Sequence, residues 1–256
     1  MTGKTLPWGD LTGIRPTKIP MKLLEEGWKN TQIAQYMRET YGVSNEKTAL
    51  AITIANREKA LLQDLDYENG YSLYVGIPFC PSICLYCSFG SHPLERWTKR
   101  VDEYLDALCK ELTFIREEMG ERKLTTVYIG GGTPTTLEPK QLRRLLSHIQ
   151  TTFDFTWVKE YTVEAGRPDS ITREKLQVMK EFPVTRISVN PQTMNQKTLD
   201  VIGRKHTVED TVNIFHMVRE LGFDNINMDL IIGLPGEGKE EVAHTLQEVE
   251  NLHPDS

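Results

Sequence analysis

The chain has 256 residues and a formal net charge of −6, so it is long enough for a sizeable core but has no general basic surface for nucleic acid or anionic membranes. No apolar run approaches the ~20 residues that a membrane span needs, and the first residues lack an apolar signal core. Only four cysteines occur, which fits a reducing compartment, so we expect a cytoplasmic protein with no nucleic-acid partner and no membrane span.

The N-terminal region is predicted to be helical. Apolar residues follow helical spacing over residues 20–41 with a break near Gly27, and Gly42 is placed to end that helix. Ser44 can cap a further helix over residues 45–63. The residues expected on the apolar faces are Leu23, Leu24, Trp28, Ile33, Ala34, Met37 and Tyr41, then Leu50, Ile54, Ala55, Leu61 and Leu62. A helix-turn-helix is the alternative, but basic and acidic residues balance here, which argues against DNA binding.

From residue 71 onward, short apolar runs alternate with longer amphipathic stretches. The short runs predict strands over residues 73–77, 126–129, 161–164, 185–189 and 226–232. The amphipathic stretches predict helices over residues 97–119, 139–153, 172–182 and 239–252, and a pair within 195–221. Such alternation predicts right-handed βαβ units and a parallel sheet, either a barrel or a doubly wound open sheet. We therefore expect an α/β protein with two domains, a helical region at 1–70 and a β/α domain at 71–256.

Three cysteines, Cys80, Cys84 and Cys87, stand at a C-x3-C-x2-C spacing after the first predicted strand. Three thiolates on one loop can hold three irons of a [4Fe–4S] cluster, and the fourth iron then stays open for a substrate. The alternatives are a zinc site completed by His92 and a disulfide with a spare thiol. The fourth cysteine, Cys109, lies in an apolar periodic stretch and is predicted to be a core thiol.

Polar or glycine-rich segments follow the other predicted strands. Residues 130–134 read Gly-Gly-Gly-Thr-Pro, and glycines permit close approach of the backbone to a ligand. Glu164 ends the third predicted strand, Gln192 ends the fourth and Asp229 lies on the fifth. Arg204 follows in the next connection. Singly, each is more often structural, but parallel β/α barrels place their active sites where these segments cluster, so we expect them to converge on one mouth.

The segment LYVGIPFCPSICLYC at residues 73–87 resembles the cluster loop of radical S-adenosylmethionine enzymes, and more narrowly that of the oxygen-independent coproporphyrinogen III oxidase family. The Gly-Gly-Gly-Thr-Pro loop and the run DLIIGLP at 229–235 are similar to further motifs of that family. The resemblance covers the chain from about Ser72 to its end. It implies a partial TIM barrel, usually of six βα units, with a [4Fe–4S] cluster and S-adenosylmethionine as cofactors. Because the chain stops where a sixth strand should begin, we expect an incomplete barrel and a fragment of a longer chain.

The resemblance also implies roles for single residues. The implied metal ligands are Cys80, Cys84 and Cys87, and the implied cofactor contacts are Tyr74, Tyr86, Gly131, Gly132, Thr133, Glu164, Gln192, Arg204 and Asp229. The glycine-rich loop receives the amino group of S-adenosylmethionine, and Glu164 contacts its nucleoside or ammonium group. Arg204 suits the methionine carboxylate as a charge-assisted donor, and Asp229 suits a ribose hydroxyl. Tyr74 is in addition the candidate catalytic residue.

The reaction implied by the resemblance is the oxygen-independent oxidative decarboxylation of coproporphyrinogen III. One electron from a low-potential donor cleaves S-adenosylmethionine, and the 5′-deoxyadenosyl radical abstracts hydrogen from a propionate side chain. Loss of an electron and CO2 leaves a vinyl group, twice, which gives protoporphyrinogen IX. The alternative is a haem-trafficking chaperone of the same superfamily, which binds haem without turning over a porphyrinogen.

Two positions depart from the best-studied branch of the family, which has a fourth cysteine at Phe89 and a histidine at Gly76. Residues 1–70, with LTGIRPTK at 11–18, are instead similar to the region before the barrel in the HemZ-type branch, which is generally assigned as coproporphyrinogen dehydrogenases. The chaperones also lack the fourth cysteine, so Phe89 does not separate the two functions. We expect the chain as given to bind the cluster, to turn over porphyrinogen weakly or not at all, and to leave its fifth strand without an outer neighbour.

Overall fold

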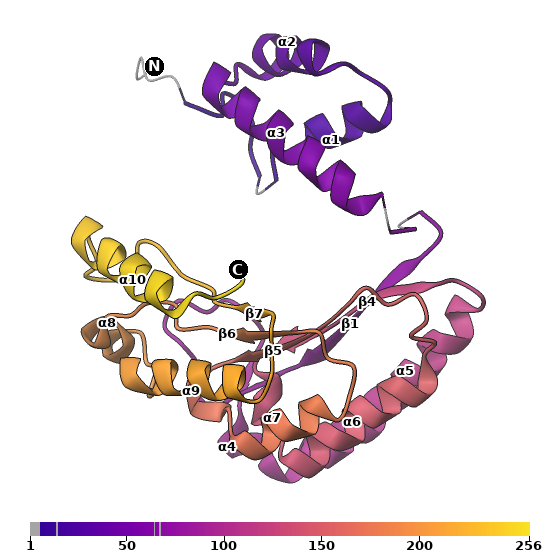
Figure 1. Ribbon diagram of the computed structural model, residues 1–256, viewed down its shortest axis with the longest axis vertical. Helices are drawn as coiled ribbons and strands as arrows, with labels where there is room; N and C mark the ends of the chain where they lie inside the picture. The colour runs from indigo at the N-terminus through magenta and orange to yellow at the C-terminus, as the bar shows by residue number, and fades with distance from the viewer. Residues whose placement is uncertain (1–5, 14, 64, 67) are drawn as a thin grey trace. The chain divides into compact units, whose positions relative to one another are not determined.

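The computed structural model describes residues 6–13, 15–63, 65–66 and 68–256. The chain divides into two compact units, of which the first ends at Glu68 and the second begins at Asn69 (Figure 1). Each unit has a hydrophobic core of its own. Within the described ranges, no helix has both the length and the apolar character that crossing a membrane requires.

The described part of the first unit is helical, as predicted. Its helices are α1 (Lys18–Glu25), α2 (Asn30–Tyr41) and α3 (Asn45–Leu62). The predicted break near Gly27 separates α1 from α2, and Gly42 ends α2 in the left-handed conformation with φ 65°. The Ser44 hydroxyl accepts a hydrogen bond from the Lys47 N–H at 3.3 Å and caps α3. Both predicted helix signals are therefore confirmed.

The buried face of α3 differs from the prediction. Leu50 and Leu61 were expected on the apolar face but are exposed, Leu61 at 76%. Ala55 is buried as expected, and the other buried residues of α3 are Thr48, Ala51 and Ile52. Apolar residues occur on several sides of this helix, so their spacing alone did not identify the side that packs against α1 and α2.

Among the described residues of the second unit, five parallel strands form one sheet in the order β1–β4–β5–β6–β7. The strands are β1 (Tyr71–Ile77), β4 (Leu124–Gly131), β5 (Glu160–Gly166), β6 (Arg186–Val189) and β7 (Ile226–Asn227). Helices connect successive strands, so the sheet is built from βαβ units. The predicted α/β fold with a parallel sheet is confirmed.

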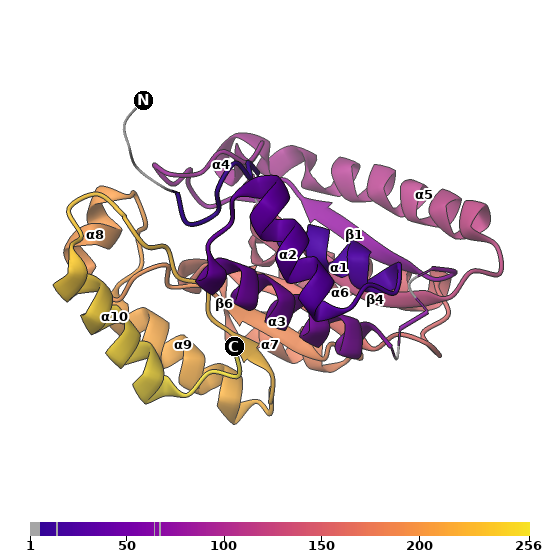
Figure 2. The ribbon, with the colours of Figure 1, turned by 90° about the horizontal axis from the view of Figure 1, so that it is seen from above.

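Helices connect the strands of the second unit, and one more follows the last strand. They are α4 (Leu94–Trp97), α5 (Val101–Met119), α6 (Pro139–Thr152), α7 (Arg173–Lys180), α8 (Gln196–Val201), α9 (Val208–Glu220) and α10 (Lys239–Leu252), with single 3-10 turns at Thr98–Arg100, Pro134–Thr136 and Pro168–Ser170. Helices α5, α6, α7 and α9 lie along one side of the strands (Figure 1). Seen from above, α5 and α10 lie at opposite ends of the sheet (Figure 2).

The alternation of side chains along the strands gives the sheet a second, open face. In β1, Leu73 and Val75 are buried in the main core, whereas Tyr74 between them is 62% exposed. Tyr74 and Tyr128 are register partners on β1 and β4, and their rings stack with centroids 5.7 Å apart. Aromatic and polar side chains therefore gather on the face that the helices leave open.

The fifth strand is shorter than the predicted segment 226–232. β7 has two residues, and Ile232 is 77% exposed. The regular ladder between β6 and β7 ends at Ser188 and Asn227, and an isolated parallel bridge between Gln192 and Leu230 lies beyond it. In this bridge the Gln192 N–H donates to the Asp229 carbonyl and the Ile231 N–H donates to the Gln192 carbonyl.

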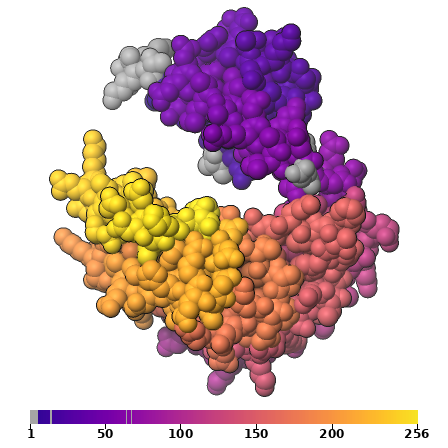
Figure 3. Space-filling view, viewed as in Figure 1, coloured from indigo at the N-terminus to yellow at the C-terminus, as the bar shows by residue number. Residues whose placement is uncertain are grey.

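β7 is an edge strand of the described sheet, as expected, and the residues after α10 form hydrogen bonds with its outer edge. The Asp255 N–H donates to the Ile226 carbonyl at 2.9 Å, and the Met228 N–H donates to the Ser256 carbonyl at 2.8 Å. The Asp255 carboxylate also accepts from the Ile226 N–H. Helix α10 and the residues after it, shown in yellow, form this margin of the second unit (Figure 3).

Candidate functional site

A cavity of about 770 Å³ in the second unit is lined by residues from the open face of the sheet and from the loops that follow its strands. Every site residue predicted from the sequence lines it, namely Tyr74, Cys80, Cys84, Tyr86, Cys87, Gly131, Gly132, Thr133, Glu164, Gln192, Arg204 and Asp229. These residues are spread over more than 150 positions of the chain, and the parallel sheet brings them together because its strand ends meet at one edge.

The three cysteines of the loop lie on the wall of this cavity as free thiols, with Cys80 and Cys84 buried and Cys87 half-buried. Short strands β2 (Phe79–Cys80) and β3 (His92–Pro93) pair with each other and join the two ends of the loop. Within the described ranges, no three or more His, Cys, Asp or Glu side chains are gathered so that they could hold a metal ion. A [4Fe–4S] cluster differs from a single ion because each of its irons takes its own thiolate.

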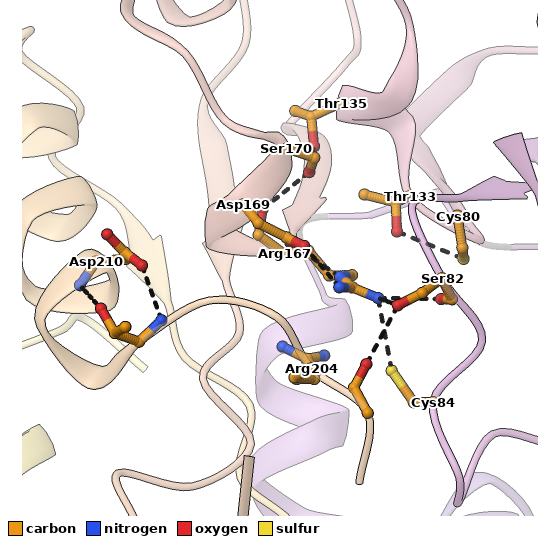
Figure 4. Close-up of polar contacts among 12 residues, drawn as sticks. Cys80, Ser82, Cys84, Thr133, Thr135, Arg167, Asp169, Ser170, Arg204 and Asp210 are labelled. Atoms are coloured by element: carbon orange, nitrogen blue, oxygen red, sulfur yellow. Dashed lines mark hydrogen bonds and ion pairs between the residues drawn. The ribbon is translucent and has the colours of Figure 1, made fainter. Parts of the chain in front are cut away.

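The glycine-rich loop after β4 packs directly against the cysteine loop. The Gly132 N–H donates to the Ile77 carbonyl and the Thr133 N–H to the Phe79 carbonyl, both at 2.7 Å. The Thr133 hydroxyl lies 3.5 Å from Cys80 Sγ (Figure 4). A Cβ atom on Gly132 would stand 2.6 Å from the Phe79 carbonyl oxygen and 3.0 Å from Cys80 Sγ. Only glycine fits there, because both neighbours are parts of the cysteine loop.

Arg204 is a buried cation at the cavity. Its Nη1 donates to the Asn190 carbonyl at 2.5 Å and its Nη2 to the Tyr86 hydroxyl at 3.2 Å. Its Nε has no hydrogen-bond partner among the described residues. Burial raises the pKa of Tyr86 to about 12 against the opposing charge of Arg204, so the phenol stays protonated at neutral pH. Arg204 is therefore fixed by two contacts and keeps one N–H for an anionic group.

Glu164 lies inside β5 rather than at its end, on the open face of the sheet. Its carboxylate accepts a hydrogen bond from the Tyr128 hydroxyl at 3.1 Å. Burial raises the pKa of Glu164, the Tyr128 hydrogen bond opposes this, and the charge of Asp229 adds to it. Burial and then the charge of Glu164 raise the pKa of Tyr74 as well. Two carboxylates and two neutral phenols thus face one cavity, which favours a cationic ligand beside Glu164.

Gln192 and Asp229 lie on the connections beyond β6 and β7, not on the strands where they were expected. The Asn190 side chain accepts from the Asp229 N–H at 3.1 Å, and the Asp229 carboxylate accepts from the Asn227 side chain at 2.8 Å. Gln192 is buried with φ 67°, a left-handed conformation that is uncommon for a residue other than glycine. Such conformations cluster at ligand sites.

Sequence reasoning missed Tyr128, Asn190 and Arg167, which also line the cavity. Tyr128 could have been found from strand alternation, because it is the outward position of an otherwise apolar strand. Asn190 and Arg167 directly follow β6 and β5, in the positions where the other site residues were sought. A single asparagine or arginine after a strand does not by itself indicate a functional site, so the sequence alone did not identify either residue.

Two other predictions fail in this geometry. Cys109 is half-buried on α5 outside the main core, and its carbonyl accepts from the His148 ring at 2.9 Å, so it is not a core thiol. His92 is exposed, and its ring lies against Trp97 with centroids 5.0 Å apart. It does not face the cavity, so the alternative of a zinc site completed by His92 has no support here.

His206 is buried close to the charged groups of the cavity, at 1% exposure. Neither ring nitrogen has a hydrogen-bond partner among the described residues. The pKa of His206 is lowered to about 4, first by burial and then by the charge of Arg204, while Asp169 opposes the shift. The imidazole is therefore neutral at physiological pH.

Comparison with known proteins places this geometry among related chains. The chain is 44% identical over 259 residues to the oxygen-independent coproporphyrinogen-III oxidase-like protein HemZ of Bacillus subtilis, covering 100% of this chain and 52% of that protein. It is 40% identical over 176 residues to the heme chaperone HemW of the same organism, covering 68% of this chain and 46% of HemW. The chain thus spans about half the length of the curated relatives it matches.

Among solved structures, the coproporphyrinogen III oxidase HemN from Escherichia coli, described as a radical SAM enzyme, matches with a TM-score of 0.67 and 32% identity over 77% of this chain and 45% of that chain. Methylornithine synthase, PylB, matches with a TM-score of 0.53 at 13% identity over 92% of this chain and 65% of that chain, and so shares the fold alone.

The family comparison covers most of the second unit. The model for the Radical SAM superfamily matches residues 74–249, which is more than half of the chain. That superfamily uses a [4Fe–4S] cluster and S-adenosylmethionine, the two cofactors predicted above, and all residues that line the cavity lie within the matched range. The chain belongs to the radical S-adenosylmethionine superfamily.

Proposed function

We propose that this chain is the cofactor-binding part of an oxidoreductase that converts propionate side chains of coproporphyrinogen III to vinyl groups and so forms protoporphyrinogen IX. The observation that carries the proposal is the gathering of three loop cysteines and the polar residues of successive strands around one cavity of about 770 Å³. Each conversion removes one hydrogen atom, one electron and CO2 from a propionate, so it needs a one-electron radical chemistry that side chains alone do not supply.

The residues of this cavity fit the two cofactors. Three thiols on one wall, Cys80, Cys84 and Cys87, are the ligand set for three irons and leave the fourth iron without a protein ligand. The contact between Gly132 and the cysteine loop keeps backbone rather than side chain next to that place. The unpaired Nε of Arg204 provides a donor for a carboxylate.

The remaining cavity residues fit the other groups of S-adenosylmethionine. We assign Glu164 to its ammonium or nucleoside, because a buried carboxylate gains most from a cationic partner. We assign Asp229 and Gln192 to the ribose and its surroundings, Tyr86 to the cofactor pocket beside Arg204, and the backbone of residues 131–133 to the amino group. When bound, cluster and S-adenosylmethionine together supply a carbon-centred radical that abstracts hydrogen after uptake of one electron from a low-potential donor.

Tyr74 is the proposed catalytic residue of the chain. Its ring stacks on Tyr128 at the open face, and 62% of its surface is exposed. Its raised pKa keeps the phenol protonated at neutral pH, so it can donate a hydrogen bond to a substrate or cofactor group at the mouth. The stacked pair also gives the mouth of the cavity a flat aromatic wall, which suits a large substrate built from flat pyrrole rings.

The choice of substrate is supported by the extent of the similarity. HemZ, named as oxidase-like, matches over the whole chain, and the coproporphyrinogen III oxidase of Escherichia coli matches over 92% of it. The second candidate is a haem chaperone, which the 40% identity to HemW favours, but that match covers only 68% of the chain.

The two functions are separated by one pair of assays on anaerobically reconstituted protein. The enzyme converts coproporphyrinogen III with CO2 release when S-adenosylmethionine and a low-potential reductant are present, whereas the chaperone binds haem and releases no CO2. Haem binding without any turnover, in this chain and in a version extended to the length of HemZ, would contradict the enzymatic proposal.

The cofactor contacts are tested by Arg204→Ala. Loss of a charge-assisted hydrogen bond should weaken S-adenosylmethionine binding by about 1.5–3 kcal/mol, which is about 10- to 150-fold in Kd, and leave the iron content unchanged. Calorimetry on reconstituted protein measures this, with Glu164→Ala as the second variant. Unchanged affinity in both variants would overturn the assignment of this cavity to the cofactor.

A further inference from the structure

Arg167 makes contacts that none of the roles assigned above uses. It directly follows β5 and is only 3% exposed. Its Nη1 donates to the Ser82 carbonyl at 3.0 Å and to the Ser82 hydroxyl at 2.8 Å, and it lies 3.8 Å from Cys84 Sγ. The guanidinium therefore reaches from the end of β5 to the middle of the cysteine loop, where Figure 4 shows it pointing at both residues.

The other edge of the same guanidinium is held by Asp169. Nε donates to one carboxylate oxygen at 2.9 Å and Nη2 to the other at 2.6 Å, a bidentate pair between side chains that are 3% and 20% exposed. This geometry fixes the plane of the guanidinium and leaves Nη1 directed at Ser82 and Cys84. Asp169 thus determines where the positive charge of Arg167 lies.

The cysteine loop is anchored to the rest of the second unit at only a few points. The Ser82 hydroxyl also donates to the Gly203 carbonyl at 3.2 Å, and the Leu85 N–H donates to the Ile202 carbonyl at 2.9 Å. Two charged side chains also reach the loop: Arg204 donates to the Tyr86 hydroxyl, whereas Arg167 contacts Ser82 and Cys84. Arg167 Nη1 lies 3.8 Å from Cys84 Sγ, and charges at this distance interact strongly where water is excluded. The effect of Arg167 on a thiolate ligand therefore exceeds that of a neutral hydrogen-bond donor.

We propose that Arg167, held in place by Asp169, is a positioning residue that fixes the Ser82–Cys84 segment and raises the reduction potential of the cluster. The inference rests on the proposed binding of the cluster by Cys80, Cys84 and Cys87. Reduction adds one electron from a low-potential donor to the oxidised cluster, and no bond forms or breaks. The reduced cluster carries one more negative charge, so a fixed cation beside a ligand sulfur stabilises it more than the oxidised form.

Two substitutions should move the potential in opposite directions. Arg167→Gln removes the cation and leaves Asp169, so the potential should fall, whereas Asp169→Asn removes the anion and leaves the cation, so it should rise. We expect each to change the ratio of reduced to oxidised cluster at a fixed potential by about tenfold, which is about 59 mV for a one-electron couple. Arg167→Lys keeps the charge and should restore a potential close to that of the wild type, with a less firmly fixed loop.

The measurement is a redox titration followed by the electron paramagnetic resonance signal of the reduced cluster, on protein whose iron content has been determined. Arg143→Gln is the matched control, because it breaks an exposed arginine–carboxylate pair with Glu181 and changes net charge equally. It should leave the potential unchanged.

The outcomes distinguish this inference from the proposed function. Wild-type protein that takes up no [4Fe–4S] cluster would contradict the proposed site itself. The inference is overturned if the wild type binds the cluster but the reduction potentials of Arg167→Gln and Asp169→Asn equal that of the wild type. It is also overturned if the two potentials shift in the same direction. If Arg167→Gln takes up no iron, the positioning role is supported, and Asp169→Asn together with Arg167→Lys still decides the charge effect.

Discussion

The titration of His206 gives a quantitative prediction about the second unit. The imidazole is 1% exposed, has no hydrogen-bond partner among the described residues, and has a pKa lowered from 6.5 to about 4, first by burial and then by Arg204. It also precedes the first turn of α9, whose positive end disfavours a second cation. Protonating His206 in the folded protein is therefore costly.

Because the pKa of His206 is lowered in the folded protein, its effect is to make the protein less stable at low pH. Above pH 6.5 the histidine is neutral in both the folded and the unfolded chain, so it contributes nothing to the pH dependence. As the pH falls through 6.5 toward 4, His206 binds a proton in the unfolded chain but not in the folded chain. The free energy of unfolding therefore decreases. The loss should reach about 2 kcal/mol at pH 5 and roughly 3 kcal/mol below pH 4.

The assay compares the wild type with His206→Leu, an apolar residue of similar size. Between pH 8 and pH 5 the wild type should lose about 4–8 °C more in Tm than the variant, measured by circular dichroism. His216→Gln, on the exposed side of α9, controls for the change in side-chain type. An equal loss of Tm in the wild type and in His206→Leu would refute the reasoning, because the acid sensitivity would then come from other groups.

Three further substitutions test other parts of the account. Gly132→Ala should abolish or strongly reduce cluster uptake, because its Cβ would meet backbone oxygen at 2.6 Å, whereas Gly90→Ala, which meets nothing within 4 Å, should bind iron normally. Glu164→Gln should raise the Tm of cofactor-free protein at pH 8 but not at pH 4, because a raised carboxyl pKa costs stability only as the pH rises through its window. Ser44→Ala should destabilise the first unit by about 1 kcal/mol in urea unfolding and leave iron uptake unchanged, since it removes only the cap of α3.

The parallel α/β fold could be predicted because its signals are local and repeated. The helix predicted over residues 239–252 matches α10, and the first four strands were placed within a few residues of their observed bounds. The fifth strand could not be placed in the same way. Its apolar residues predict a strand over the whole of 226–232, whereas the regular ladder ends at Asn227 and is followed by an isolated bridge at Leu230.

The site residues that belong to a motif or follow a predicted strand could be predicted from the sequence. The residues that were missed could not, because their place in the site depends on the three-dimensional arrangement. Tyr128 matters because its register partner is Tyr74, and Arg167 matters because the sheet brings it to Ser82, which is 85 positions away in the chain. Register and long-range contacts of this kind are set by packing, which composition and spacing do not encode.

The most direct test of the account is the cofactor content of anaerobically reconstituted protein. We predict about four irons per chain, an electron paramagnetic resonance signal on one-electron reduction, and a change in that signal when S-adenosylmethionine is added, because the cofactor then binds the open iron. Cys109→Ala should behave like the wild type, and Cys84→Ala should lose the signal. One tightly held zinc per chain, or a reduced cluster whose signal does not respond to S-adenosylmethionine, would contradict the central claim.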